Sequence, residues 1–182
     1  MNTVVLFSSP NKSGNTAYLL EKYLEALKGE VDIFDAFKED VKPCIACGYC
    51  DSHNSCSIKD KMINIYNKID DCDVLVIASP IYFSAFPAPI KAMFDRFQLY
   101  WSKKYIQKCD VSIKSKKGIL ILTAGSNNEK MLPHVEITAK AILSTIGAQI
   151  DHKIYALNTD NVKAQNNEEA SSLAYEIGKN QI

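Results

Sequence analysis

The sequence predicts an α/β fold of the doubly wound class, with a five-stranded parallel sheet of strand order 2-1-3-4-5 and helices on both faces. Short apolar runs rich in Val and Ile alternate with longer segments of helical period, as in repeated βα units around a parallel sheet. There are five segments of each kind, and right-handed crossovers between them fit this strand order. The length of 182 residues also fits one domain.

The elements follow one another in strict alternation along the chain. The short runs are predicted as strands at residues 3–8, 31–35, 73–78, 118–123 and 149–157. The longer segments are predicted as helices at residues 15–28, 61–69, 87–105, 131–146 and 166–179. We therefore expect one domain over residues 1–182. Its one irregular stretch, residues 36–60, is too long for a plain connection and is interpreted as a functional insertion.

The overall composition excludes several classes of partner. The chain is 47% hydrophobic and 23% charged, and its formal net charge is zero. It therefore has no electrostatic signature for nucleic acid or an anionic membrane. No run of about twenty apolar residues occurs, and the first residues carry no basic region. We expect a cytoplasmic protein that binds neither nucleic acid nor membrane.

The loop after the first predicted strand combines hydroxyls, amides and one cation, and it leads directly into a helix. In a doubly wound fold the ligand binds beyond the carboxyl ends of the strands, and a helix N-terminus favours phosphate. The alternative is a capped turn, because Ser, Asn and Thr are also ordinary N-caps. The loop matches neither the phosphate-binding loop of nucleoside triphosphatases nor the glycine pattern of dinucleotide-binding proteins. The candidate phosphate-binding residues are Ser9, Asn11, Lys12, Ser13, Asn15 and Thr16.

Two further loops are expected at the same edge of the sheet. After the third strand come Pro80, Ile81, Tyr82 and Phe83, whose apolar and aromatic side chains suit a flat aromatic ligand. Packing in the core or at a dimer contact is the alternative, and we favour it for the nearby Phe86 and Phe94. After the fourth strand, the small residues Ala124 and Gly125 would let a ligand approach the backbone closely.

Four of the six cysteines lie in the insertion with a compact spacing. Cys44, Cys47, Cys50 and Cys56 form the pattern C-x2-C-x2-C-x5-C, and four thiolates so close in sequence can surround a [4Fe–4S] cluster. A structural zinc site more often uses two cysteine pairs with a longer separation. Reduced thiols without a cluster are the alternative. Cys72 and Cys109 are interpreted as ordinary packing and surface residues.

Together these motifs resemble the NAD(P)H-dependent FMN reductase family of flavodoxin-like proteins, which have a three-layer sandwich fold. The resemblance is carried by Ser9-Pro10, Gly14-Asn15-Thr16, Ser79-Pro80-Ile81-Tyr82, Lys91 with Asp95-Arg96, and Thr123-Ala124-Gly125. It implies that residues 9–16 hold the FMN phosphate and that residues 80–83 and 124–125 line the isoalloxazine. Many relatives carry Arg where this chain has Asn11, which leaves Lys12 to neutralise the phosphate. The compact cysteine motif resembles that of the iron–sulfur flavoproteins within this group.

The resemblance also implies an activity. The chain is expected to be an FMN-dependent oxidoreductase that takes electrons from NAD(P)H or a reduced protein donor and passes them to a small-molecule or protein acceptor. No side chain is required as an acid or base, and Arg96 is interpreted as structural. A homodimer or homotetramer is implied, and the aromatic residues Phe94, Phe97, Tyr100 and Trp101 are more than one core is expected to use. The alternatives are a cluster-free quinone reductase, a non-enzymatic electron carrier and a flavin-free adaptor.

Overall fold

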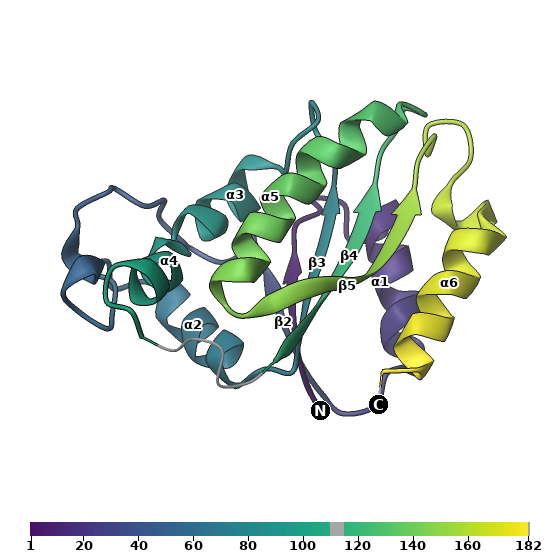
Figure 1. Cartoon of the computed structure of the whole chain (residues 1–182). Coiled ribbons are helices and arrows are strands. Elements are labelled where there is room, and N and C mark those ends of the chain that lie inside the picture. Colours follow the sequence, from purple (N-terminus) through teal and green to yellow (C-terminus); the bar gives the residue numbers. More distant parts are fainter. Residues whose placement is uncertain (110–114, 182) are drawn as a thin grey trace.

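The computed structural model describes residues 1–109 and 115–181 and confirms the predicted fold class. Five parallel strands form one sheet in the order β2-β1-β3-β4-β5 (Figure 1). The strands are β1 (Asn2–Phe7), β2 (Glu30–Asp35), β3 (Val74–Pro80), β4 (Lys116–Thr123) and β5 (Ala148–Ala156). The α-helices are α1 (Asn15–Ala26), α2 (Met62–Asp71), α3 (Ala88–Asp95), α4 (Gln98–Tyr105), α5 (Leu132–Thr145) and α6 (Glu168–Lys179).

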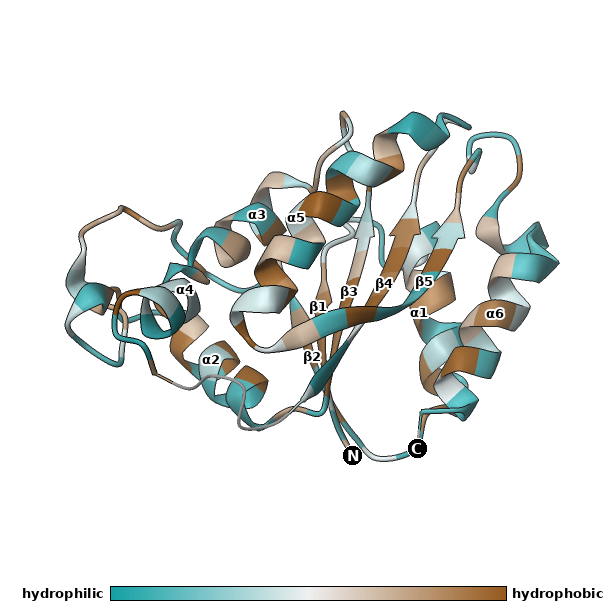
Figure 2. Ribbon diagram, viewed as in Figure 1, coloured by the Kyte–Doolittle hydropathy of each residue, from teal (hydrophilic) through white to brown (hydrophobic). Residues whose placement is uncertain are grey.

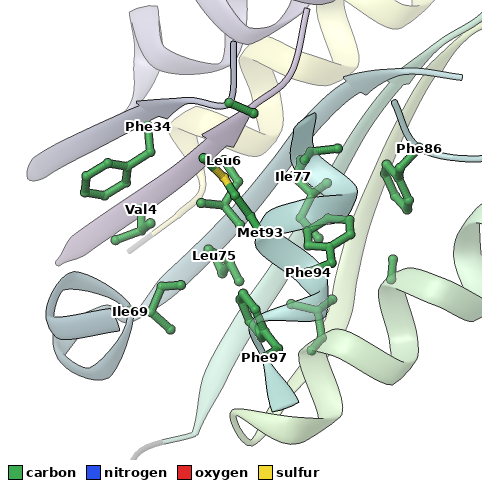
Figure 3. Packing of buried hydrophobic residues seen from close by; sticks show 14 of the residues in the cluster. Val4, Leu6, Phe34, Ile69, Leu75, Ile77, Phe86, Met93, Phe94 and Phe97 are labelled. Carbon is green, nitrogen blue, oxygen red and sulfur yellow. The ribbon is translucent and has the colours of Figure 1, made fainter. Parts of the chain in front are cut away.

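Helices cover both faces of the sheet because its central strands are apolar on both sides. All but one residue of β1 are buried, and Val5 and Leu6 point to opposite faces. Helices α1 and α6 cover one face, while α2, α3, α4 and α5 cover the other (Figure 1). Figure 2 shows the resulting apolar centre of the sheet, and Figure 3 shows the packing on the α3 side, where Phe94 and Phe97 lie against Leu75 and Ile77.

The predicted helix over residues 87–105 is wrong in one respect, because the chain forms two helices there. The N–H of Arg96 donates to the carbonyl of Met93 and that of Phe97 to Phe94, so the α-helical hydrogen-bond pattern tightens and α3 ends. The buried hydroxyl of Tyr66 donates to the carbonyl of Arg96 at 2.8 Å. This carbonyl also accepts the N–H of Leu99 at 3.2 Å, so the break is bonded both to the start of α4 and to a residue of α2 that is distant in sequence.

This break turns most of the aromatic side chains inward. Phe94, Phe97 and Tyr100 are all buried, whereas Trp101 is 42% exposed. Edge-to-face contacts connect Phe94 with Phe97 and Tyr66 with Tyr100. Phe94, Phe97 and Tyr100 therefore belong to the core of this one chain. The sequence suggests that one core would not use all four aromatics, and only Trp101 remains largely outside it. No helix in the described part of the chain is long and apolar enough to cross a membrane.

Candidate functional site

A cleft of about 180 Å³ lies at the carboxyl edge of the sheet, at the upper ends of the strands in Figure 1. The loops after β1, β3, β4 and β5 form it. This is where a doubly wound fold places its ligand. The lining residues are Ser9, Pro10, Asn11, Gly14, Asn15, Thr16, Pro80, Ile81, Tyr82, Thr123, Ala124, Gly125, Thr159 and Asp160. The structure thus brings together all of the predicted FMN-site residues except Lys12, Ser13 and Phe83.

The loop before α1 is shaped by its own polar side chains. The Ser9 hydroxyl donates to the carbonyl of Asn11 at 3.0 Å, and the N–H of Ser13 donates to the side-chain oxygen of Asn11 at 3.0 Å. Such local bonds form a tight turn ahead of the helix. Gly14 is the N-cap residue and supplies no side-chain hydrogen bond to the first turn of α1. The first N–H groups of the helix are therefore available to an anion at the cleft.

Lys12 points to the other side of this loop. Its ammonium lies 2.6 Å from a carboxylate oxygen of Asp35, at the end of β2, and donates to the carbonyl of Ser9 at 2.6 Å. It also lies 4.7 Å from the centre of the Phe7 ring, within the range of a cation–π contact. Lys12 therefore lines the hollow beside Asp35 instead of the cleft, and Asp160 is the only charged residue among the described residues that line the cleft.

The floor of the cleft carries a buried hydrogen bond that joins α1 to β4. The hydroxyls of Thr16 and Thr123 lie 2.7 Å apart, and both residues are buried. Thr123 ends its predicted strand and belongs to the residues that carry the family resemblance, but it is not among the predicted site residues. Its partner in α1 is 107 positions away, so only the fold brings the two hydroxyls together.

Single replacements of these threonines should lower the free energy of unfolding, and the two effects should not be additive. Thr16→Val or Thr123→Val leaves one buried hydroxyl without its partner, which we expect to lower the free energy of unfolding by about 1–3 kcal/mol. The double variant removes both polar groups and should be more stable than the sum of the single changes predicts. Urea unfolding of the four proteins without added cofactor measures this coupling, and additive changes would contradict it.

The loop after β3 forms a tight turn beside the cleft. The N–H of Tyr82 donates to the carbonyl of Ala85 at 2.9 Å, and the N–H of Ala85 donates back to Tyr82 at 3.0 Å. Phe83 and Ser84 between them have φ angles of +51° and +60°, the left-handed conformation that non-glycine residues adopt at an energetic cost. Phe83 is consequently fully exposed, and Tyr82 is the aromatic residue of this turn that lines the cleft.

The loops after β4 and β5 close the opposite side of the cleft. The N–H and hydroxyl of Thr159 both donate to the carbonyl of Ala124, and the N–H of Asp160 donates to that of Gly125. A methyl group on Gly125 would lie 2.5 Å from the Asp160 carboxylate, so a larger residue here would displace that side chain. Sequence reasoning missed Thr159 and Asp160, although the carboxyl end of β5 reaches the same edge of the sheet.

A second cavity, of about 470 Å³, lies beside α4. Much of its lining comes from the segment between β2 and α2 (residues 36–60; blue at the left of Figure 1), which we call the cysteine loop. All four predicted cluster ligands line it. The lining residues are Cys44, Ile45, Ala46, Cys47, Gly48, Tyr49, Cys50, Asp51, Cys56, Ser57, Ile58, Asp95, Arg96, Gln98, Leu99, Trp101 and Ile106. Among the described residues no three His, Cys, Asp or Glu side chains are placed to hold a single metal ion.

The cysteine loop wraps its backbone around the sulfur atoms. Ala46 and Gly48 have φ angles of +51° and +70°, and alternating left-handed residues turn successive N–H groups to one side of the chain. The N–H of Ala46 lies 3.4 Å from the sulfur of Cys44. The hydroxyl of Ser57 lies 3.2 Å from the sulfur of Cys47. This hydroxyl, followed by the Tyr49 backbone, lowers the pKa of the Cys47 thiol, whereas burial, followed by the charge of Asp51, raises that of Cys50.

A buried ion pair anchors the base of the cysteine loop. Arg96 donates to the Asp60 carboxylate at 2.8 Å and to the carbonyls of Lys42 and Ile58. The side chains of Arg96 and Asp60 are only 1% and 7% exposed. Burial, the largest influence on Asp60, raises its pKa, but the Arg96 guanidinium and the N–H groups of Lys42 and Met62 together hold the pKa below its usual value. Arg96 is thus structural, as predicted, although its partner is Asp60 and not the adjacent Asp95.

The far end of the cysteine loop is held by the α4 region. The Ser102 hydroxyl donates to the carbonyl of Cys50 and to the Asp51 carboxylate. The Gln107 amide also donates to the Cys50 carbonyl, at 2.7 Å. The loop is therefore tied to the folded body at its base, through Arg96, and at its third cysteine, through the α4 region.

Comparison with protein families gives one match over most of the chain. The family described as NADPH-dependent FMN reductase matches residues 1–161. The curated relatives include an iron–sulfur flavoprotein of Methanosarcina thermophila, 34% identical over 131 residues, which are 70% of this chain and 65% of that protein. An iron–sulfur flavoprotein of Archaeoglobus fulgidus is 35% identical over 51% of this chain and 49% of its own length. The matches thus span about half to two thirds of these relatives.

Solved structures show the same fold at low sequence identity. The NAD(P)H:quinone oxidoreductase of Methanothermobacter marburgensis superimposes with a TM-score of 0.75, at 16% identity, over 99% of this chain and 95% of that one. An FMN-dependent NADH-azoreductase of Bacillus anthracis, solved in complex with FMN, gives a TM-score of 0.63 at 14% identity, over 98% and 96% of the two chains. At these identities the likeness establishes the fold alone.

Proposed function

The chain belongs to the NADPH-dependent FMN reductase family, and on this premise we propose that it is an FMN-dependent oxidoreductase with a [4Fe–4S] cluster. It takes electrons from NAD(P)H or a reduced protein and delivers them to a small acceptor or a protein partner. The observation that carries the proposal is the pairing of a cleft at the carboxyl edge of the sheet with a cavity lined by four cysteines. A cytoplasmic homodimer or homotetramer, with one domain over residues 1–182, is part of the proposal.

The cleft fits FMN in three respects. The uncapped first turn of α1 offers N–H groups to a phosphate. Ser9, Asn11, Asn15 and Thr16 line the cleft around this turn, and Ser13 lies in the same loop. Ala124, with a small side chain, and Gly125, with none, line the cleft, so a ring edge can approach their backbone. Pro80, Ile81 and Tyr82 supply an apolar wall, and Phe83 stands at its rim. When bound, FMN accepts a hydride and releases electrons in pairs or singly.

Lys12 contributes to this site by shaping the loop. Its bonds to Asp35 and the Ser9 carbonyl fix the turn that presents Ser9 and Asn11 to the cleft. Because its ammonium is already paired with Asp35, the proposed phosphate site depends on neutral donors and the α1 dipole. The chain's own residues therefore bind and orient the cofactor and exclude water, and none of them is needed as an acid or base.

The cysteine cavity fits a [4Fe–4S] cluster. Four thiols converge on one space, and N–H groups of the wrapped loop and the Ser57 hydroxyl are placed to donate to sulfur. The buried Nε–H of Arg96, on the same wall, has no hydrogen-bond partner among the described residues. The four cysteines of this cavity supply the thiolates that hold a [4Fe–4S] cluster in other proteins. Such a cluster passes electrons one at a time.

Protein purified without oxygen tests this proposal. We expect bound FMN and about four irons with matching acid-labile sulfide per chain. Cys47→Ser should lose the iron and retain the FMN, because the two sites lie on different elements. Cys109→Ser is the matched control, since Cys109 is exposed and lies outside the cysteine cavity, and it should retain both. The measurements are the absorption spectrum with iron, sulfide and flavin assays on the same sample.

The other outcomes separate the alternatives. FMN without iron in the wild-type protein would identify a cluster-free reductase. FMN and iron with negligible NAD(P)H oxidation would indicate a carrier served by a protein donor. A protein that binds neither group would refute the proposal.

A further inference from the structure

We propose that Arg96 is a positioning residue for the cluster, in that its Nε–H donates a hydrogen bond to a sulfur atom in the cysteine cavity and its charge raises the midpoint potential. This inference rests on the proposed function, because it requires the cluster. It assigns Arg96 a role beyond its structural ion pair with Asp60.

The first argument is the hydrogen bonding of the guanidinium. Nη1 donates to the Lys42 carbonyl and to Asp60, and Nη2 donates to the Ile58 carbonyl and to Asp60. Nε is buried and makes no hydrogen bond to any described residue, although the Tyr66 side chain interacts with the same guanidinium. Because the guanidinium is planar and rigid, the four bonds from its two ends fix the direction of the Nε–H. A buried donor without a partner is rare in folded proteins, and here it belongs to a residue that lines the cysteine cavity.

The second argument is the charge of the cavity. Arg96 is the only cation among the described residues that line it, and Asp51 and Asp95 also line it. The guanidinium of arginine is not deprotonated in proteins, and here it is paired with the Asp60 carboxylate at 2.8 Å. The side chain therefore stays charged. Reduction adds a negative charge to a cluster held by four thiolates, and a nearby cation stabilises that added charge.

The composition of the chain permits a test without any substitution. Arg96 is the only arginine in the sequence, so arginine carrying ¹⁵N at Nε labels one side chain. We expect the paramagnetic signal of the dithionite-reduced cluster to show a ¹⁵N hyperfine coupling in labelled protein and none in unlabelled protein. A normal cluster signal without ¹⁵N coupling would overturn the role of Arg96. A sample without iron and without that signal would instead overturn the proposed function, and this inference with it.

Two substitutions test the charge. Arg96→Gln removes the cation and should lower the midpoint potential, whereas Asp60→Asn keeps the cation, removes its counter-charge and should raise the potential. General loosening of the cysteine loop would shift both variants in the same direction, so opposite shifts distinguish the proposed role from a merely structural one. If Arg96→Gln does not fold, Asp60→Asn alone remains decisive, and an unchanged or lowered potential in that variant would refute the proposal.

Discussion

Asp60→Ala is expected to lower the free energy of unfolding by about 3–5 kcal/mol, because it leaves the buried Arg96 guanidinium without its counter-charge. The Asp60 side chain is 7% exposed. It accepts hydrogen bonds from Arg96 and from the N–H groups of Lys42 and Met62. Since native domains are stable by only about 5–15 kcal/mol, this loss should also loosen the cysteine loop and reduce the iron retained per chain.

Chemical denaturation of the wild-type and variant proteins measures the effect, with Lys91→Ala as the matched control. Lys91 also pairs with an aspartate, Asp95, but both of their side chains are roughly half exposed. Exposed pairs generally contribute about 1 kcal/mol or less, so the control should remain close to wild type. Equal losses of unfolding free energy in the two variants would show that the buried Asp60–Arg96 pair contributes no more to stability than an exposed pair does.

The contribution of Asp60 should also depend on pH in a defined direction. Its pKa in the folded protein is lowered, so its stabilising effect is fully present above the unfolded-state value of about 3.9. The effect is lost as the pH falls through the lower folded-state pKa. The difference in stability between wild type and Asp60→Ala should therefore shrink with acidification below about pH 4.

Gly178→Ala is expected to lower the free energy of unfolding by about 2 kcal/mol. The added methyl group would lie 2.1 Å from the backbone carbonyl oxygen of Tyr23, so α6 would have to move away from α1. Helix propensity alone predicts the opposite sign, because alanine is favoured over glycine inside a helix by about 1 kcal/mol. A loss of stability would therefore show that the close packing of α6 on α1 dominates, and a gain would show that helix propensity does.

Ser172→Ala provides the control for this second prediction. Ser172 lies in the same helix but is exposed, so its replacement should leave stability nearly unchanged. Because α6 supports α1, and the first turn of α1 borders the cleft, Gly178→Ala should also weaken FMN binding, measured by quenching of flavin fluorescence. A stabilised Gly178→Ala protein would contradict the close approach of the two helices.

The sequence by itself determined the five strands, their order along the chain and the loops that meet at the cleft. Apolar periodicity is a local property, so residues such as Val5 and Leu6 in β1 identify their strand without knowledge of the rest of the chain. The rule that ligands bind at the carboxyl ends of parallel strands then predicted a common edge for Ser9, Tyr82 and Gly125. The spacing of the four cysteines likewise predicted that they face one space.

Only the tertiary structure decided which side chains turn toward these sites. Tyr66 bonds to the backbone at the break between α3 and α4, Lys12 pairs with Asp35, and the cysteine loop is anchored by Arg96, 36 residues from Asp60. In each case the partner is distant in sequence and is brought close by the packing of the sheet and its helices. The physical reason is that backbone periodicity is set by neighbouring residues, whereas the direction of a polar side chain is set by whichever charges and hydrogen-bonding groups folding places beside it.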